Sequence, residues 1–194
     1  MTTELPTEPA TGHDVPQGRG ATVWLTGLPS AGKTTIATAL ADRLRREGHR
    51  VEVLDGDELR RNLTADLGYS REDRNVNVRR VGYVAELLAR NGIKAIVPVI
   101  APYAESRGAV RSRHEATGAP YVEVHVSTPI EVCSDRDVKG LYAKQRDGEI
   151  SGLTGVDDPY EIPESPELRL DAHEQTVAQS VDGVHAALSA RNLA

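Results

Sequence analysis

Cysteine, phenylalanine and long apolar runs are scarce or missing in this chain, and each absence narrows what the protein can be. The single cysteine, Cys133, excludes an internal disulfide, and we expect it to be a packed thiol. No apolar run is long enough to indicate a signal peptide or a membrane helix, so we expect a cytoplasmic protein. Phenylalanine is absent, which leaves aromatic contacts to six tyrosines and Trp24.

The chain also has fewer positively charged than negatively charged residues. The chain carries 23 lysines and arginines against 29 aspartates and glutamates, a net charge of −6. This balance argues against a general affinity for nucleic acid or an anionic membrane, so we expect neither as a partner. The six histidines lack metal-ligand spacing, since even the nearest pairs are more than one helical turn apart, and we predict no zinc site.

The length of 194 residues suits one α/β domain with a substantial core. Residues 1–20 contain several prolines and glycines and no apolar periodicity, which predicts a flexible N-terminal arm without chemistry of its own. Residues 21–194 are predicted to form a single domain.

A phosphate-binding loop lies near the start of that domain. It fits the pattern Gly, four residues, Gly, Lys, Ser or Thr, and reads Gly27-Leu28-Pro29-Ser30-Ala31-Gly32-Lys33-Thr34. A β-forming run, 21–26, precedes it and a helical run, 33–47, follows it. In this context we expect Lys33 to reach the β and γ phosphates of a nucleoside triphosphate and the Thr34 hydroxyl to bind Mg²⁺. A plain strand-to-helix turn is the alternative, which the Lys-Thr pair disfavours.

The rest of the chain alternates strands and helices. We expect further strands at 50–54, 94–100, 121–126 and 168–170, and helices from 57, at 71–90, at 104–117, from 129 through 133, and at 173–190. This alternation predicts right-handed crossovers in a P-loop nucleoside-triphosphate-binding fold, an α/β architecture whose central parallel sheet is covered by helices on both faces. The charged, glycine-rich residues 137–162 are predicted to be a mobile lid rather than core.

Two carboxylates follow the second predicted strand, at the edge where an open α/β sheet binds ligands. We assign Asp57 to the acceptor hydroxyl and to the Mg²⁺ ion, directly or through water, with Asp55 in support. The alternative is a turn with a helix cap. The front half of helix 71–90 is charged and predicted to be free for an anionic ligand, whereas the apolar rear half packs.

Several cations could neutralise the phosphates and the acceptor. Arg60, Arg74 and Asn77 are candidates for a clamp on the acceptor, although arginines on helices are often only solvated. Lys139 and Arg146 could fold over the phosphates with the lid, the alternative being ordinary surface charge.

The order of these motifs resembles the adenylylsulfate kinase (APS kinase) family over roughly residues 21–172. The segments that carry the resemblance are the P-loop, Leu54-Asp55-Gly56-Asp57, Leu67-Gly68-Tyr69-Ser70, Asp73-Arg74, Asn77-Val78-Arg79-Arg80, Ile100-Ala101-Pro102-Tyr103, Asp137-Val138-Lys139-Gly140-Leu141-Tyr142 and Thr154-Gly155-Val156-Asp157-Asp158-Pro159-Tyr160. The resemblance implies transfer of the ATP γ-phosphoryl group to the ribose 3′-hydroxyl of adenosine 5′-phosphosulfate (APS), giving PAPS and ADP in sulfate assimilation. It also implies a Mg²⁺-dependent homodimer.

The resemblance assigns roles residue by residue. The catalytic set is Lys33, Asp57 and Lys139. The nucleotide-binding set is Gly27 through Thr34 with Thr35 and Arg136. The acceptor-binding set is Asp55, Asp57, Arg60, Tyr69, Arg74, Asn77, Ile100, Ala101, Lys139 and Leu153.

The chain departs from the family pattern in three ways. The family often stacks the APS adenine between two phenylalanines, where this chain has Tyr69 and Leu153, so some stacking energy is lost. Ala101 replaces a serine annotated in the family as a phosphorylated intermediate, which favours direct in-line transfer. Ser151 stands where a lysine is frequent and weakens lid closure.

Two other functions remain open from the sequence. One is a P-loop kinase of the same build that acts on another small hydroxyl acceptor. The other is a nucleotide-dependent switch that binds partners, which the missing guanine-reading Asn-Lys-x-Asp motif and the acceptor-side arginines disfavour. Reversing the charge of Arg74 distinguishes an APS enzyme, because acceptor use would fall while ATP binding persisted.

Overall fold

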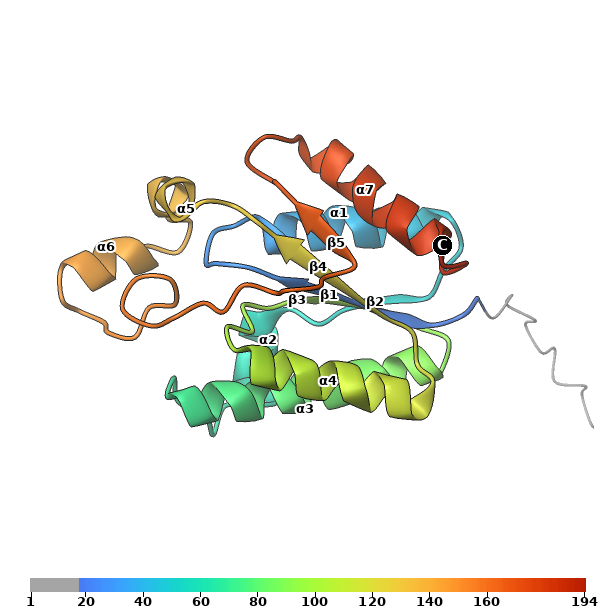
Figure 1. Ribbon diagram of the computed structural model, residues 1–194, viewed down its shortest axis with the longest axis horizontal. Helices are drawn as coiled ribbons and strands as arrows, with labels where there is room; N and C mark the ends of the chain where they lie inside the picture. The colour runs from blue at the N-terminus through green and yellow to red at the C-terminus, as the bar shows by residue number, and fades with distance from the viewer. Residues whose placement is uncertain (1–17) are drawn as a thin grey trace, which may run out of the picture.

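The computed structural model describes residues 18–194, so most of the predicted arm at 1–20 lies outside the described residues (Figure 1). Five strands and seven helices follow in the order β1 (Ala21–Thr26), α1 (Lys33–Arg46), β2 (Val51–Val53), α2 (Gly56–Asn62), α3 (Arg71–Arg90), β3 (Lys94–Pro98), α4 (Ala104–Thr117), β4 (Tyr121–Val126), α5 (Ile130–Arg136), α6 (Leu141–Arg146), β5 (Leu168–Leu170) and α7 (Val177–Ser189).

The five strands form one parallel sheet in the order β2-β3-β1-β4-β5, which confirms the predicted fold class. β1 is central, with Val23 paired to Ile96 of β3 on one side and to Val122 of β4 on the other. All six residues of β1 are buried. A strand covered on both faces is expected to be mostly apolar, and the two threonines of β1 are buried together with its apolar residues. The P-loop begins where β1 ends.

Helices cover both faces of the sheet. Figure 1 shows α1 and α7 on one face and α3 and α4 on the other. Alternate residues of β1 serve the two cores: Val23 and Leu25 pack in the cluster with α1 and α7, whereas Trp24 packs in the cluster with α3 and α4. The two cores fix β1 from both sides, so the loop that follows it starts from a rigid position.

Helix starts follow local capping chemistry. Ser70 caps α3 by accepting a hydrogen bond from the Asp73 amide at 3.1 Å, as its place before an acidic first turn predicts. The start predicted for the last helix, residue 173, is wrong. Thr176 and Gln179 form a capping box that begins α7 at Val177 instead.

Other predicted boundaries shift by a few residues. β2 and β3 are shorter than the predicted 50–54 and 94–100, and α5 continues past residue 133 to Arg136. Cys133 is fully buried in the core, which confirms the packed thiol. Among residues 18–194, no helix combines the length and the hydrophobicity that crossing a membrane requires.

The expectation that residues 137–162 lie outside the core is wrong for part of this segment. Tyr142 and Leu153 are buried members of the core cluster that includes α1. A Cβ atom added to Gly155 would lie 2.5 Å from Leu28 Cδ2, so the segment meets the P-loop closely. Apolar residues spaced irregularly through a charged stretch gave no periodic signal of this packing.

The close contact of α3 with α4 predicts opposite effects for two glycine substitutions. A Cβ atom at Gly82 would lie 2.4 Å from Val110 Cγ2, and a β-branched side chain cannot swing aside. Overpacking of this kind costs roughly 1–3 kcal/mol, which exceeds the helix-propensity gain of about 1 kcal/mol for Gly→Ala. Gly82→Ala should therefore lower the free energy of unfolding in urea denaturation.

Gly108 on α4 is the matched control, because nothing lies within 4 Å of its added Cβ. Gly108→Ala should raise stability by about 0.5–1 kcal/mol through helix propensity alone. Equal effects of the two substitutions would contradict the described α3–α4 contact.

Candidate functional site

The P-loop takes its shape from two glycines. A Cβ atom on Gly27 would lie 2.5 Å from the Val126 carbonyl oxygen, so only glycine lets the loop pass the end of β4. Gly32 precedes α1 with φ 104°, in the left-handed region that glycine favours. The amide groups that open α1 form the positive end of its dipole, which suits an anion.

Lys33 lies inside the loop it belongs to. Its Nζ donates hydrogen bonds to the carbonyl oxygens of Gly27 at 2.9 Å and Leu28 at 2.7 Å, and the residue is buried. Burial lowers the pKa of this amine from 10.5 to about 7, because the charged form loses hydration. A polyanion bound at the loop would restore the charge by Coulomb attraction.

Two residues to which the sequence analysis gave no role hold two further loop carbonyls. The Tyr142 hydroxyl of α6 donates to Pro29 O at 3.1 Å, and the Thr128 hydroxyl donates to Ala31 O at 2.8 Å. Burial raises the pKa of Tyr142, which keeps its hydroxyl a donor. The sequence signal for either residue was weak, since a threonine after a strand and a tyrosine in a charged stretch are common.

Asp55 and Asp57 have different positions. The Asp55 carboxylate accepts from the amides of Asp57 at 3.0 Å and Glu58 at 3.2 Å, so it caps α2 as the alternative interpretation held. Asp57 instead contacts Lys139, 82 residues away in the chain, in an ion pair. Both side chains of that pair are more than half exposed, so it contributes about 1 kcal/mol at most.

The predicted lid meets the P-loop next to this ion pair. The Val138 amide donates to Ser30 Oγ at 3.2 Å, and Lys139 follows directly. Arg136 also lies near, with its Nη1 3.9 Å from where a Cβ on Gly32 would be. The structure therefore brings together a carboxylate, an ammonium group and the loop.

On the predicted acceptor side, the ring of Tyr69 is exposed, whereas Asn77 is hydrogen-bonded to another side chain. Tyr69 is 72% exposed, and the Arg60 guanidinium lies 4.9 Å from the centre of its ring while donating to Gly68 O at 2.9 Å. Asn77 is tied to Thr64, whose hydroxyl donates to Asn77 Oδ1 at 2.8 Å.

The expectation that the front half of α3 is free is wrong for Arg74. Its guanidinium donates to Tyr69 O at 2.7 Å, and to the Thr154 hydroxyl and Gly152 O at 2.5 Å each. It also lies 3.6 Å from the Asp158 carboxylate, and its side chain is only 12% exposed. Arg74 fastens residues 152–158 to α3 because their carbonyl and carboxylate groups need donors once they are buried.

The remaining predicted acceptor residues line the end of β3 and the core. The Thr26 hydroxyl donates to Ile100 O at 2.6 Å, and Arg107 donates to Ala101 O at 2.7 Å. Ala101 has φ 44°, an uncommon left-handed conformation for a residue with a Cβ. Leu153 is 7% exposed, so in this structure it packs in the core.

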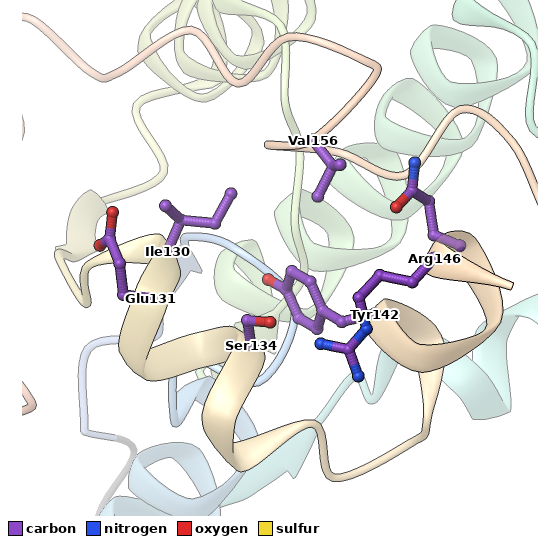
Figure 2. A pocket seen from close by; sticks show the side chains of 7 residues that line it. Ile130, Glu131, Ser134, Tyr142, Arg146 and Val156 are labelled. Atoms are coloured by element: carbon purple, nitrogen blue, oxygen red, sulfur yellow. The ribbon is translucent and has the colours of Figure 1, made fainter.

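Two hollows open near α1 and the lid. Thr34 and Thr35 line one of about 400 Å³, together with Thr38, Ala39, Asp42 and Val177. Figure 2 shows the other, a pocket of about 260 Å³ between α5, α6 and Val156. Arg146, predicted to fold over the phosphates, lines this second pocket, and Tyr142, which holds Pro29, forms part of its wall.

This chain is similar to known proteins in sequence and in structure. The family model described as Adenylylsulphate kinase matches residues 19–171. A probable adenylyl-sulfate kinase of Synechocystis sp. is 52% identical over 165 residues, which cover 85% of this chain and 91% of that protein.

Two solved structures are similar over most of this chain. The Mycobacterium tuberculosis APS kinase CysC, solved in complex with AMPPNP and APS, has a TM-score of 0.86 and 44% identity, covering 89% of this chain and 99% of that one. The hexameric APS kinase from Thiobacillus denitrificans has a TM-score of 0.70 and 36% identity, covering 91% of this chain and 30% of that one.

The lowered pKa of Lys33 predicts that the site takes up a proton when it binds a nucleoside triphosphate. With a pKa of about 7, most of the amine is neutral at about pH 8, and phosphates beside it raise that pKa. Binding should consume close to one proton, measured by titration calorimetry in buffers of different ionisation enthalpy. A guanidinium stays charged, so Lys33→Arg should bind with little uptake. A binding enthalpy independent of buffer in the unsubstituted protein would contradict the assignment.

Proposed function

Because this chain belongs to the adenylylsulphate kinase family, we propose that it phosphorylates the ribose 3′-hydroxyl of APS with ATP, giving PAPS and ADP. The observation that carries the proposal is the meeting of Asp57 with Lys139 beside the P-loop, to which the Val138–Ser30 hydrogen bond attaches the lid segment. A phosphotransferase needs a carboxylate at the acceptor and cations at the transferred group, and this meeting supplies both in one place.

The transfer is a direct in-line displacement. The bond between the γ-phosphorus and the β–γ bridging oxygen breaks, and a bond from that phosphorus to the 3′-oxygen forms. Lys33 and Lys139 stabilise the charge on the transferring group, and Asp57 orients the 3′-hydroxyl and accepts its proton. Ala101 offers no hydroxyl, so no phosphorylated side chain intervenes at that position.

The oxygen donors at the site fit Mg²⁺. Thr34 supplies a hydroxyl and Asp57 a carboxylate, both exposed, and Mg²⁺ takes its other ligands from phosphates and water. Among residues 18–194, no three histidine, cysteine, aspartate or glutamate side chains are grouped so that they could hold a metal ion by themselves. Bound there, Mg²⁺ neutralises charge on the β and γ phosphates.

The acceptor assignments extend the same proposal. Arg60 and Asn77 contact the phosphosulfate and sugar, Tyr69 stacks on the adenine, and the backbone of Ile100 and Ala101 lines the adenine end. The exposed face of Tyr69 supports its role, since an exposed aromatic ring is available for stacking. Arg74 holds residues 152–158 in place through its hydrogen bonds, and Leu153 does so by packing in the core.

Three further assignments complete the proposal: a homodimer, a cytoplasmic location, and a single domain over residues 21–194 whose lid spans about 137–162. Sedimentation of the purified protein measures the first. Limited proteolysis with and without ATP and APS tests the lid, because a closing lid gains protection.

The activity is tested by incubating the protein with ATP, Mg²⁺ and APS and detecting ADP and PAPS, beside Lys33→Ala and a panel of other nucleotides. ADP that forms only with APS, and not in the variant, supports the proposal. ADP that forms with a different acceptor would leave the P-loop chemistry standing and overturn APS as substrate.

We expect the substitution Asp57→Asn to lower kcat selectively. Removing a positioned general base typically costs 10²–10⁴-fold, so kcat should fall by about that factor while the KM for ATP changes little. Steady-state kinetics with each substrate varied gives both numbers.

Asp55→Asn is the matched control, since asparagine caps a helix as well as aspartate does. Its loss of kcat should be much smaller. Equal losses in the two variants would remove the catalytic role from Asp57.

A further inference from the structure

The end of the predicted lid is attached to the loop after β3. We name residues 100–104 the acceptor loop and residues 158–161 the strap. Hydrogen bonds join them from Glu161 N to Pro102 O at 2.8 Å, from Ala104 N to Glu161 Oε2 at 2.7 Å, and from the Tyr103 hydroxyl to the Asp158 carboxylate at 2.9 Å. The strap therefore moves with the acceptor loop.

Arg107 is hydrogen-bonded to both the acceptor loop and the strap. It lies in the first turns of α4 and is only 4% exposed. Its guanidinium donates to Ala101 O of the acceptor loop at 2.7 Å and to Glu161 O of the strap at 2.6 Å, and its Nε lies 3.1 Å from Glu123 Oε1 on β4. A planar guanidinium presents its donors in fixed directions, whereas the ammonium of a lysine is a compact charge whose donors rotate.

The tyrosine of the strap completes the support. Thr26 donates its hydroxyl proton to Ile100 O, so the Tyr160 hydroxyl, 3.0 Å away, donates to Thr26 Oγ1. The Arg107 guanidinium lies 5.9 Å from the centre of the Tyr160 ring. The carbonyl groups of Ile100 and Ala101 are thus held by β1 and by α4 respectively.

Ala101 needs this support. Its left-handed φ of 44° is unfavourable for a residue with a Cβ and persists only when the surroundings impose it. The group that fixes the Ala101 carbonyl is the buried guanidinium of Arg107.

We propose that Arg107 is a positioning residue for the acceptor: it holds the acceptor loop and the strap in the conformation that receives the adenine end of APS. It acts through Ala101 and Glu161 and does not itself touch substrate. The inference rests on the proposed function for its substrate, whereas its structural part, the fastening of the two segments, is independent of activity.

Arg111 provides a matched control. It lies one helical turn further along α4 and pairs with the same Glu123, at 3.1 Å, and with Glu167 at 2.6 Å. None of its described hydrogen bonds or ion pairs involves the acceptor loop or the strap. Removing either arginine leaves Glu123 with one cation fewer, so both variants lose stability, but only Arg107 fastens the loop.

The kinetic test compares Arg107→Met with Arg111→Met. The Arg107 variant should raise the KM for APS about tenfold or more, as expected when buried carbonyls lose their donor, with the KM for ATP within about twofold. The Arg111 variant should leave both values within about twofold, although its melting temperature also falls. An equal change in the KM for APS in the two variants overturns the proposal. Where Arg107→Met does not fold, Arg107→Lys takes its place, with a smaller rise in the KM for APS.

Hydrogen exchange gives a second test that needs no activity. The amides of Ala104 and Glu161 should exchange about tenfold faster or more in the Arg107 variant and at unchanged rates in the Arg111 variant. Unchanged protection at both amides in the Arg107 variant overturns the proposal. If the unsubstituted protein does not phosphorylate APS, the proposed function fails, and the exchange measurement still decides whether Arg107 fastens the two segments.

Discussion

The hydrogen bonds that hold the carbonyl groups of the P-loop are the constraint on which the rest of the site depends. Lys33 holds the first two carbonyls, Tyr142 the third and Thr128 the fifth. A loop whose carbonyl groups are fixed this way cannot rearrange freely, so in the proposed function it offers the phosphates a preformed cradle. Because Tyr142 comes from α6, the cradle also depends on the segment after α5 being in place.

The charged groups of the site divide by burial into two kinds. The pair of Asp57 with Lys139 is exposed and weak, so a ligand can separate it with little loss. The pair of Arg107 with Glu123 is buried, and breaking such a pair typically costs about 3–5 kcal/mol. The proposed chemistry therefore uses the exposed side chains of Asp57 and Lys139, which can move, while the buried pair of Arg107 and Glu123 holds the backbone around the site.

Much of the fold followed from the sequence because its signals are local. The apolar runs of β1 and β3, the cap of Ser70 on α3 and the P-loop pattern each depend on neighbours in the chain, and the parallel sheet follows from their alternation. Apart from shifted boundaries of helices and strands, the errors concern long-range contacts. Nothing near Arg74 in the sequence indicates that residues 152–158 would occupy its donors. The charge of residues 137–162 concealed the burial of Tyr142 and Leu153.

The sequence by itself determined the phosphate loop, the order along the chain of the strands and of the helices other than α6, and the family, because these depend on residue type and spacing. Only the tertiary structure decided which groups meet. Asp57 lies 82 residues from Lys139, and Arg107 lies 54 residues from Glu161, and no local pattern encodes either contact. Such contacts arise when strands and loops distant in the chain share one edge of a sheet, where buried carbonyls and carboxylates must find donors wherever the fold supplies them.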